Sequence, residues 1–509
     1  MTKPRAKGAV AAGHEITARA AAQVLQMGGN AFDATIAALF ASCVCEPVLS
    51  SPGGGGFLMA HQANKSRTSL FDFFVQTPQK KRNCREIEFK PIHVDFGTTR
   101  QEFLIGMGAS AVPGFVSGCY AAHEALCTLP MAALLQPAIK AAREGVVMDG
   151  FQSRLFKIVE PILLNTEKTR ALFAPGGSLL GQGDLYCNPQ LAETFETLSR
   201  EGPGFFSGGE VCHTIIELVE ELGGHLGIDD FNSYNTIERD PLILPFGASA
   251  RVCLNPPPSA GGPLIGFGLT LAQRLEDAGG VLDGLSIAKI LQTIDHRKQD
   301  LFENPDLMSC DDTIVRSVAD LQSQSITSKG TTHISVIDND GNAAAATVSN
   351  GEGNGHMVGD FGFMLNNMLG EEDLNPTGFH HWPCGVRLSS MMAPTLIDND
   401  HGELAVLGSG GANRIRSAMV QVLLHIKAGK SAKEAVNAAR MHYEAGKLDV
   451  EDWIDKNTLK TLLETYPHTC LWDQPNMFFG GVHMVTQAED GSFDGAGDRR
   501  RDGCFVIVD

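Results

Sequence analysis

The alternation of apolar and polar residues divides the chain into a helical first part and a strand-rich last part. Residues 14–46 carry apolar side chains at helical spacing, and Gly28 and Gly29 break this stretch into two amphipathic helices. Ala and Leu recur at similar spacing over residues 111–150 and 190–225. This spacing indicates helices that pack on a sheet.

Three stretches in the last part have the period-two pattern of β-hairpins. Residues 331–349 alternate about an Asp-Asn-Asp-Gly-Asn turn, and residues 393–409 and 480–498 follow the same plan. Helices first and hairpins last are typical of a layered α+β fold. The sequence contains no internal repeat of fixed period.

Two segments rich in glycine and proline interrupt these patterns. Gly53 to Gly56 lead into an apolar strand, without the Lys and Ser/Thr of a phosphate loop or the strand-to-helix order of a dinucleotide site. We therefore interpret them as close backbone packing beside a strand. Residues 255–263 contain three successive prolines and a glycine pair, which predict a stiff, irregular loop before a helix over 264–275.

The composition is that of a soluble globular protein, with 509 residues of which 43% are hydrophobic and 19% charged. A net charge of −19 argues against a nucleic-acid partner, which needs a basic patch. No run approaches the roughly 20 apolar residues of a bilayer span, so no membrane partner is expected. The basic start of the chain lacks the apolar core of a signal peptide. A cytoplasmic protein is predicted; a periplasmic or secreted one would follow if the start were truncated.

The cysteines, histidines and acidic runs predict no metal site. The twelve cysteines include no C-x-x-C pair and are interpreted as buried thiols. The acidic run 371–373 lacks the twelve-residue spacing of a calcium loop. Five histidines stand out, but they lack the spacing of metal ligands on a helix. They are His333, His356, His380, His381 and His442.

A polar, serine-rich connector over residues 302–330 ends in Ser-Lys-Gly at the first hairpin, the composition of an exposed, readily cut segment. Gly330 leaves its carbonyl sterically open, and the Thr331 hydroxyl can attack it in an N-to-O acyl shift. Hydrolysis of that ester frees a threonine whose α-amine, with a reference pKa near 7.7–8.0, can serve as base for the adjacent hydroxyl. Gly330 and Thr331 are thus a candidate self-processing pair. A Gly-Thr step before a strand is also common in plain turns.

Motifs along nearly the whole chain resemble those of the γ-glutamyltransferases (γ-glutamyltranspeptidases), which are N-terminal-nucleophile hydrolases. Thr-Thr-His at 331–333 resembles the start of the family's mature small subunit. The other similar segments follow the family's order and cover residues 28–38, 51–57, 255–263, 363–367, 389–395, 408–415 and 495–503.

The resemblance implies a four-layer αββα sandwich of two stacked antiparallel sheets. It also implies a self-cleaving precursor whose large fragment, 1–330, and small fragment, 331–509, stay interlocked as one globular unit. A homodimer of this heterodimer is a further expectation.

Catalytic roles follow from the resemblance for four positions. Thr331 falls on the family's nucleophile. Ser349 falls on a Thr eighteen residues later that hydrogen-bonds to the nucleophile and assists processing. The oxyanion hole, a pair of backbone N–H groups, falls on Gly411 and Ala412 in an ungapped count, with Gly410 and Gly411 as the near alternative.

The implied substrate-binding positions depart further from the family. Its asparagine that holds the substrate amine falls on Gly351, and Asn350 beside it could substitute. Its acid that grips the ammonium falls on Glu371, with Glu372 and Asp373 beside it.

The pair of serines that binds carboxylate in the family falls on Ser389 and Ser390, or on Ser390 and Met391 in an ungapped count. Phe74 stands where the family has an arginine that clamps the α-carboxylate, and Met368 where it has Gln or Glu. Phe cannot imitate a bidentate guanidinium. The catalytic machinery is therefore predicted intact and the glutamyl pocket altered, unless Arg387, Arg414 or another residue supplies the clamp.

The predicted activity is that of a self-processing amidohydrolase or acyltransferase on γ-glutamyl or related acyl amides, acting through a threonyl ester. Its partners would be a small amide or peptide and a water or amine acceptor, and no cofactor or metal is implied. One alternative is an acylase for dicarboxylic amides such as glutaryl, as in the cephalosporin-acylase relatives, because that acyl group lacks the α-amine. The other is a catalytically silent binding scaffold.

Overall fold

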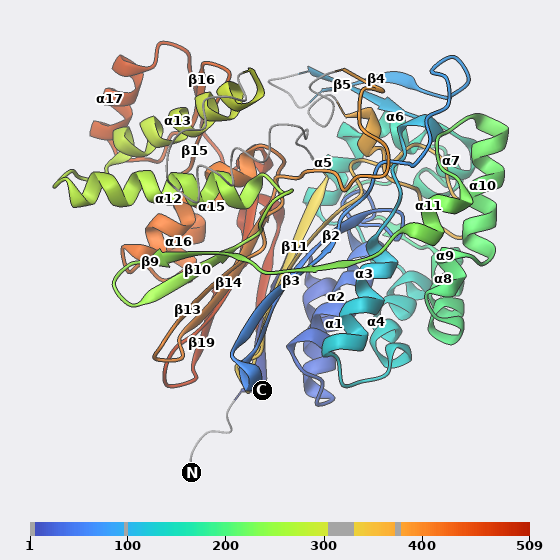
Figure 1. Cartoon of the computed structure of the whole chain (residues 1–509), viewed down its shortest axis with the longest axis horizontal. Helices are drawn as coiled ribbons and strands as arrows, with labels where there is room; N and C mark the ends of the chain where they lie inside the picture. The colour runs from blue at the N-terminus through green and yellow to red at the C-terminus, as the bar shows by residue number, and fades with distance from the viewer. Residues whose placement is uncertain (1–5, 96–99, 304–329, 372–377) are drawn as a thin grey trace.

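The structure of the protein, a computed structural model, describes residues 6–95, 100–303, 330–371 and 378–509 (Figure 1). Most of the predicted connector lies outside the described residues, as do Glu372 and Asp373. None of the helices in these ranges is both long and apolar enough to cross a membrane.

Two antiparallel sheets form the centre of the fold (Figure 1). The first has seven strands in the order β20-β1-β11-β12-β2-β3-β8, and the second has six in the order β19-β18-β14-β13-β10-β9. The seven-stranded sheet consists of β1 (Gly8–Ala12), β2 (Gly55–Gln62), β3 (Arg67–Phe73), β8 (Ile237–Arg239), β11 (Thr331–Asp338), β12 (Ala343–Ser349) and β20 (Cys504–Val508). The six-stranded sheet consists of β9 (Leu242–Phe246), β10 (Ala250–Leu254), β13 (Thr395–Asn399), β14 (Leu404–Gly410), β18 (Gly481–Gln487) and β19 (Phe493–Ala496).

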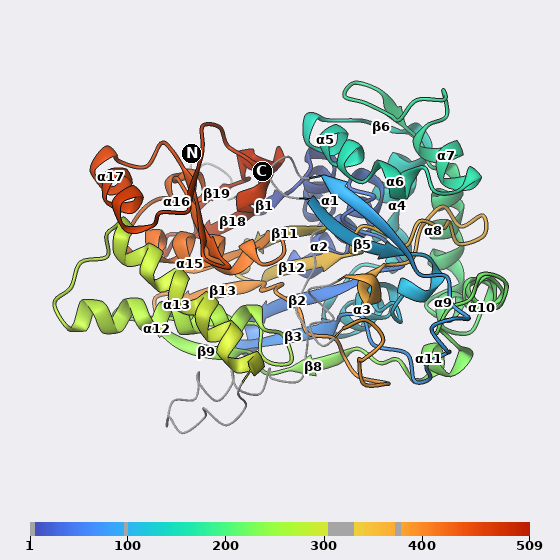
Figure 2. The same ribbon diagram turned by 90° about the horizontal axis from the view of Figure 1, so that it is seen from above.

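Helices cover the outer face of each sheet, and the view from above shows them on opposite sides of the strands (Figure 2). Those on the seven-stranded sheet are α1 (Glu15–Gln26), α2 (Ala31–Cys45) and α3 (Phe115–Leu126). Those on the six-stranded sheet are α12 (Gly261–Asp277), α15 (Arg414–Lys427) and α16 (Ala432–Asn437), with α13 (Gly284–Glu303) packed on α12. The predicted four-layer αββα sandwich is therefore confirmed.

The remaining elements lie around this sandwich. The helices are α4 (Met131–Glu144), α5 (Gly150–Ile158), α6 (Glu160–Leu163), α7 (Glu167–Phe173), α8 (Pro189–Glu201), α9 (Gly204–Ser207), α10 (Glu210–Leu222), α11 (Ile228–Ser233) and α17 (Lys456–Thr465). The strands are β4 (Lys90–Asp95), β5 (Arg100–Ile105), β6 (Val146–Val147), β7 (Leu185–Tyr186), β15 (Met441–Glu444), β16 (Lys447–Glu451) and β17 (Thr469–Trp472).

The helices and hairpins expected from the sequence are present, but one predicted boundary is wrong. The sequence predicts an irregular segment over 255–263, whereas α12 begins at Gly261 and includes Gly262 and Pro263. A proline fits the first turn of a helix because its missing N–H would have no intrahelical partner there. The sequence also gave no sign of β1, which is buried along its whole length.

The side chains of β11 alternate between two environments, as a strand requires. Ile334 and Val336 belong to the apolar core beneath α1 and α2. His333 faces the six-stranded sheet, where its ring lies against Gly408. Its nitrogens contact the hydroxyl of Thr347 at 2.7 Å and that of Ser335 at 2.9 Å. Burial lowers the pKa of His333, so the ring is neutral and serves packing between the sheets.

The glycine run packs backbone against backbone, as predicted. A Cβ atom on Gly54 would overlap the carbonyl oxygen of Ser349, and one on Gly56 would overlap that of Thr347. β2 thereby pairs with β12, with Gly55 opposite Ser349. Only glycine allows this approach to the end of β12.

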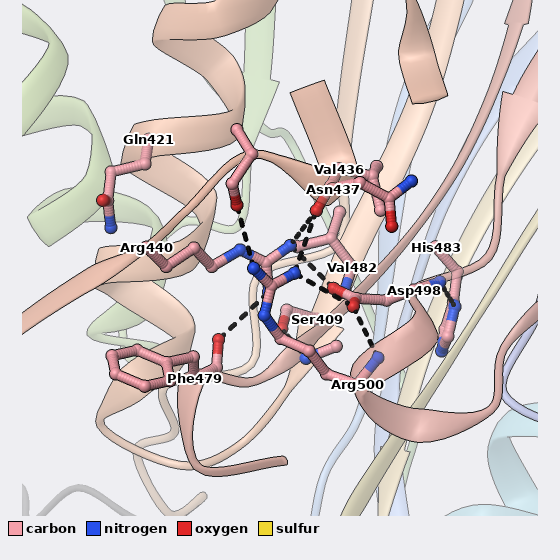
Figure 3. Close-up of polar contacts among 12 residues, drawn as sticks. Ser409, Gln421, Val436, Asn437, Arg440, Phe479, Val482, His483, Asp498 and Arg500 are labelled. Atoms are coloured by element: carbon pink, nitrogen blue, oxygen red, sulfur yellow. Dashed lines mark hydrogen bonds and ion pairs between the residues drawn. The ribbon is translucent and has the colours of Figure 1, made fainter. Parts of the chain in front are cut away.

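A buried network of arginines and acids fixes the loop before β20 (Figure 3). Asp498 pairs with Arg440 at 2.7 Å and with Arg500 at 3.2 Å. Arg500 also donates to Glu451 through Nε at 2.7 Å. Burial alone would raise the pKa of Asp498, but the two arginines hold that pKa at about 2. The network therefore keeps its charges and orients the next residue, Arg501.

Replacing Asp498 by alanine leaves two buried guanidinium groups without their shared partner. We expect Asp498→Ala to lower the free energy of unfolding by about 3–5 kcal/mol, measured by urea denaturation. Asp494→Ala, on an exposed position of the neighbouring β19, is the control and should change it by less than about 0.5 kcal/mol. Equal effects of the two substitutions would contradict a stabilising role for the network.

Candidate active site

The candidate processing pair lies where β11 begins and β12 ends. The two strands pair antiparallel, with Thr331 directly opposite Ser349. The hydroxyl of Ser349 donates a short hydrogen bond to the carbonyl oxygen of Gly330 and accepts the N–H of Gly351 at 3.1 Å. The hydroxyl that the resemblance assigns to processing thus contacts the carbonyl group that Thr331 would attack.

Gly330 is enclosed by backbone on two sides. A Cβ atom there would overlap the carbonyl oxygen of Gly351 and would lie 3.2 Å from that of Val48. A side chain at this position would push Gly330 away from the turn after β12 and from the loop after α2. The position therefore requires glycine for steric reasons, and the openness of its carbonyl to attack by Thr331 stays a prediction.

Thr331 and Thr332 face opposite sides of the sheet, because neighbouring side chains on a strand alternate. Thr331 is fully buried and shares the inter-sheet face with His333. Its carbonyl oxygen accepts a hydrogen bond from Nη1 of Arg501 at 2.9 Å. Thr332 points toward the helices and donates from Oγ1 to Glu46 at 2.6 Å.

The turn that follows β14 lies beside Thr331. A Cβ atom on Gly410 would overlap the carbonyl oxygen of Thr331. Gly411 and Ala412 have φ angles of 122° and 52°, in the left-handed region that an alanine rarely adopts. This sharp turn leads into α15 and is the expected place of the oxyanion hole. Either predicted pair of N–H groups lies on it, and the choice between them stays a prediction.

Two of the four predicted substrate-binding residues have buried polar atoms without a hydrogen-bond partner among the described residues. These are both amide atoms of Asn350 and the hydroxyl of Ser389. Such atoms in a protein interior are usually satisfied, so they suit a bound polar ligand. Ser390 differs, since its Oγ accepts the N–H of Met392 at 3.0 Å. Glu371 lies beside Gly351, where a Cβ atom would be 2.7 Å from its Oε1.

Phe74 and Met368, the two positions predicted to depart from the family, pack among hydrophobic side chains. Phe74 and Met368 are fully buried in the same hydrophobic cluster. The Phe74 ring stacks on Phe57 with ring centres 5.5 Å apart. Their hydrophobic neighbours carry no charge for a zwitterionic head, and the charged residue Arg387 beside Phe74 binds the Phe74 carbonyl oxygen.

Arg387, one of the two arginines considered as a replacement clamp, is committed elsewhere. Its guanidinium donates short hydrogen bonds to the carbonyl oxygen of Phe74 and the hydroxyl of Tyr234. It also donates to the carbonyl oxygen of Asn235 at 2.6 Å and lies 3.5 Å from a carboxylate oxygen of Asp72. Arg387 therefore braces the end of β3.

Arg414, the other arginine, lines a cavity of about 650 Å³ whose wall includes Gly330. Its Nε donates to the carbonyl oxygen of Phe478 at 3.1 Å. In a chain of net charge −19, the cavity wall is locally rich in cations, which favours anionic ligands. Its charged lining residues are Arg154, Arg414, Arg499, Arg500, Arg501, Lys447, Glu352, Glu444 and Asp449.

The histidines noted in the sequence do not gather into one site. His442 lines the cavity and contacts Ser417 at 2.8 Å and Glu444 at 3.3 Å, whereas His333 lies between the sheets. The described ranges contain no group of three or more His, Cys, Asp or Glu residues that could hold a metal ion.

Two buried charged residues at the site, Glu46 and Arg501, were missed by the sequence reasoning. Burial raises the pKa of Glu46 to about 7 and lowers that of Arg501 to about 10. Glu46 follows α2 just before the glycine run, and Arg501 lies in the 495–503 segment. Arg501 thus lies in a segment that carries the family resemblance, whereas Glu46 lies between two such segments, 28–38 and 51–57. No spacing of residue types relates either residue to Thr331.

The chain is similar to known proteins over nearly its whole length. The sequence model of the family described as Gamma-glutamyltranspeptidase matches residues 17–283 and 277–508. The chain is 28% identical to the Glutathione hydrolase proenzyme of Escherichia coli (strain K12), over 97% of this chain and 91% of that protein. It is 27% identical to the Acylase ACY 1 proenzyme of Pseudomonas sp. (strain V22), over 99% and 94%.

A solved structure has a similar fold. The crystal structure of cephalosporin acylase from Bacillus halodurans superposes with a TM-score of 0.82 at 20% identity, covering 99% of this chain and 96% of that one. At this identity the likeness concerns the fold alone. The family match, by contrast, spans both candidate fragments. The chain therefore belongs to the gamma-glutamyltranspeptidase family and is an enzyme of that family, as its motifs predict.

Proposed function

We propose that the chain cuts itself between Gly330 and Thr331, and that Thr331 then transfers acyl groups from small amides to water or to an amine. The observation that carries this proposal is the hydrogen bond from Ser349 to the Gly330 carbonyl, directly opposite Thr331. The word proenzyme in the names of both relatives supports a processed, two-chain product.

The cut would proceed by an acyl shift. The Thr331 oxygen attacks the carbonyl carbon of Gly330, and the bond from that carbon to the Thr331 nitrogen breaks. The hydroxyl proton passes to this nitrogen, so an ester and a free α-amine form. Charge develops on the carbonyl oxygen, where the Ser349 hydroxyl already donates. Water then hydrolyses the ester, which leaves a carboxylate on Gly330 and restores the Thr331 hydroxyl beside its free amine.

Turnover would use the same hydroxyl with the new α-amine as its base. The substrate amide donates its acyl group to Thr331 and releases its amine, and the backbone N–H groups of Gly411 and Ala412 stabilise the oxyanion. Water or an acceptor amine then takes the acyl group. The fragments 1–330 and 331–509 remain together, because the seven-stranded sheet contains strands of both.

The apolar surroundings of Phe74 and Met368 favour a second candidate for the acyl group. A dicarboxylic acyl amide, such as a glutaryl amide, has no ammonium to bury, and its carboxylate suits the unpartnered Ser389 hydroxyl or the cationic wall that includes Arg414. The relative named as an acylase supports this candidate, and the one named as a glutathione hydrolase supports a γ-glutamyl substrate.

The proposal includes the oligomeric state and the cellular location. A homodimer of the processed heterodimer would double the mass measured by light scattering after size-exclusion chromatography. A cytoplasmic location would place the protein in the cytosolic fraction of its cells.

The first prediction concerns the junction. Purified wild-type protein should separate into two bands on a denaturing gel, and the smaller fragment should begin Thr-Thr-His-Ile-Ser on N-terminal sequencing. Thr331→Ala should remain a single chain of about 54 kDa, because both steps need the same hydroxyl. Another first residue, or an uncut wild-type chain after prolonged incubation, would remove Thr331 from its role.

The second prediction concerns Ser349. Loss of its hydrogen bond to the developing charge corresponds to roughly 1.5–3 kcal/mol, so Ser349→Ala should slow processing and turnover by about ten- to a hundred-fold. Ser349→Thr keeps the hydroxyl and supplies the residue that the family has, and it should restore most of the rate. Wild-type rates in the alanine variant would show that this hydroxyl has only a structural role.

The third prediction concerns the acyl group. Burying a zwitterionic head against Phe74 and Met368 should cost several kcal/mol, so glutathione and γ-glutamyl anilides should have a lower kcat/KM than a glutaryl anilide. Phe74→Arg should shift the preference back toward γ-glutamyl donors, with its Tm measured because Phe57 stacks on the replaced ring. Efficient wild-type turnover of glutathione would contradict this specificity.

A further inference from the structure

A second contact reaches the nucleophile strand from the helix side of the sheet. Glu46 caps the end of α2 and is only 1% exposed. Its carboxylate accepts hydrogen bonds from the hydroxyls of Thr332 at 2.6 Å and Thr17 at 3.3 Å. A Cβ atom on Gly13 would lie 2.6 Å from the carboxylate and 3.0 Å from the Thr332 hydroxyl, so the pair is tightly enclosed.

The segment that carries Glu46 spans the proposed cleavage site. Glu46 holds the residue after Thr331, and the carbonyl of Val48, two residues later, lies beside Gly330. Pro47 between them has a fixed φ, which limits the freedom of this segment. The same short loop therefore contacts both sides of the Gly330–Thr331 bond.

Arg501 completes the arrangement from the other side. It donates to the carbonyl of Thr331 at 2.9 Å, and its side chain packs so closely on Gly481 that a Cβ atom there would overlap it. The adjacent Arg500 is locked by Asp498 and Glu451, so Arg501 starts from a rigid backbone. A cation thus holds the Thr331 carbonyl, and an acid holds the next hydroxyl.

We propose that Glu46 is a positioning residue for the nucleophile: together with Arg501 it holds the Thr331–Thr332 peptide, so that Thr331 keeps its place once it becomes a chain end. This inference rests on the proposed role of Thr331. Before the cut, Gly330 restrains Thr331 through the peptide bond. After the cut that restraint is lost, and a free chain end frays unless other contacts hold it.

The charge of Glu46 makes its contact with the Thr332 hydroxyl depend on pH. Burial raises its pKa to about 7 and Asp149 acts in the same direction, whereas the hydroxyls of Thr332 and Thr17 and the charge of Arg501 oppose the rise. The ionised carboxylate is the stronger acceptor for the Thr332 hydroxyl. The hold should therefore be strongest above pH 7 and weaken as Glu46 is protonated. The other titratable groups that face Glu46 or its neighbour Asp149 are His14, Cys43, Cys45, Arg154, Asp502 and Cys504.

The test compares processed wild-type enzyme with Glu46→Gln over a range of pH. The amide keeps the shape but cannot ionise, so kcat at pH 8 should fall by about tenfold with KM unchanged. Below pH 6, where wild-type Glu46 is protonated as well, the two enzymes should converge. A purely structural carboxylate would show no such convergence.

Variants of Thr332 test whether Glu46 changes kcat through the Thr332 hydroxyl. Thr332→Val should lose the same factor in kcat, Thr332→Ser should restore it, and the double variant with Glu46→Gln should be no worse than either single one. Asp33→Asn is the matched control, because Asp33 is a buried carboxylate at the other end of α2 that binds Thr128 and Leu129. It should lower Tm and leave the pH profile of kcat unchanged.

The two proposals fail separately. Turnover that depends on Thr331 supports the proposed function whichever way Glu46 behaves. A Glu46→Gln enzyme with the wild-type kcat at every pH, or additive losses in the double variant, overturns the positioning role alone.

Discussion

The pairing of β11 with β12 is the interaction on which the rest of the site depends. Its register sets Thr331 opposite Ser349 and so brings a hydroxyl to the Gly330 carbonyl. That register holds because glycines let β2 approach β12 from the far side, and because no side chain at 330 separates the strands. The chemistry follows from close backbone packing.

The sequence predicted the parts of the site that have a local pattern. Period-two alternation and an Asp-Gly turn are enough to place the hairpin that begins at Thr331. The pattern did not predict β1, because this strand is short, alanine-rich and buried on both faces and so shows no alternation of apolar and polar residues. Glu46 and Arg501 were not predicted for another reason. Glu46 lies 286 residues from Thr332, and Arg501 lies 170 residues from Thr331. Only the folded topology relates such distant residues.

The groups proposed for catalysis tolerate substitution better than those proposed for substrate recognition. The candidate oxyanion donors are backbone N–H groups on the turn after β14, so Ala412 can stand where a glycine is usual and still donate. Recognition of the acyl head would depend on side chains, and Phe74 and Met368 are apolar residues at positions where the family resemblance implies polar ones. A family can therefore keep one reaction while its members accept different acyl groups.

The place of Arg501 in the sequence bears on when the surroundings of Thr331 are complete during synthesis. A nascent chain that has emerged as far as residue 480 already contains Thr331, Ser349 and the turn at Gly410. It still lacks Arg501, which holds the Thr331 carbonyl, and β20, which pairs with β1. The seven-stranded sheet is therefore complete only after residues 501–508 have been synthesised and β20 has paired with β1.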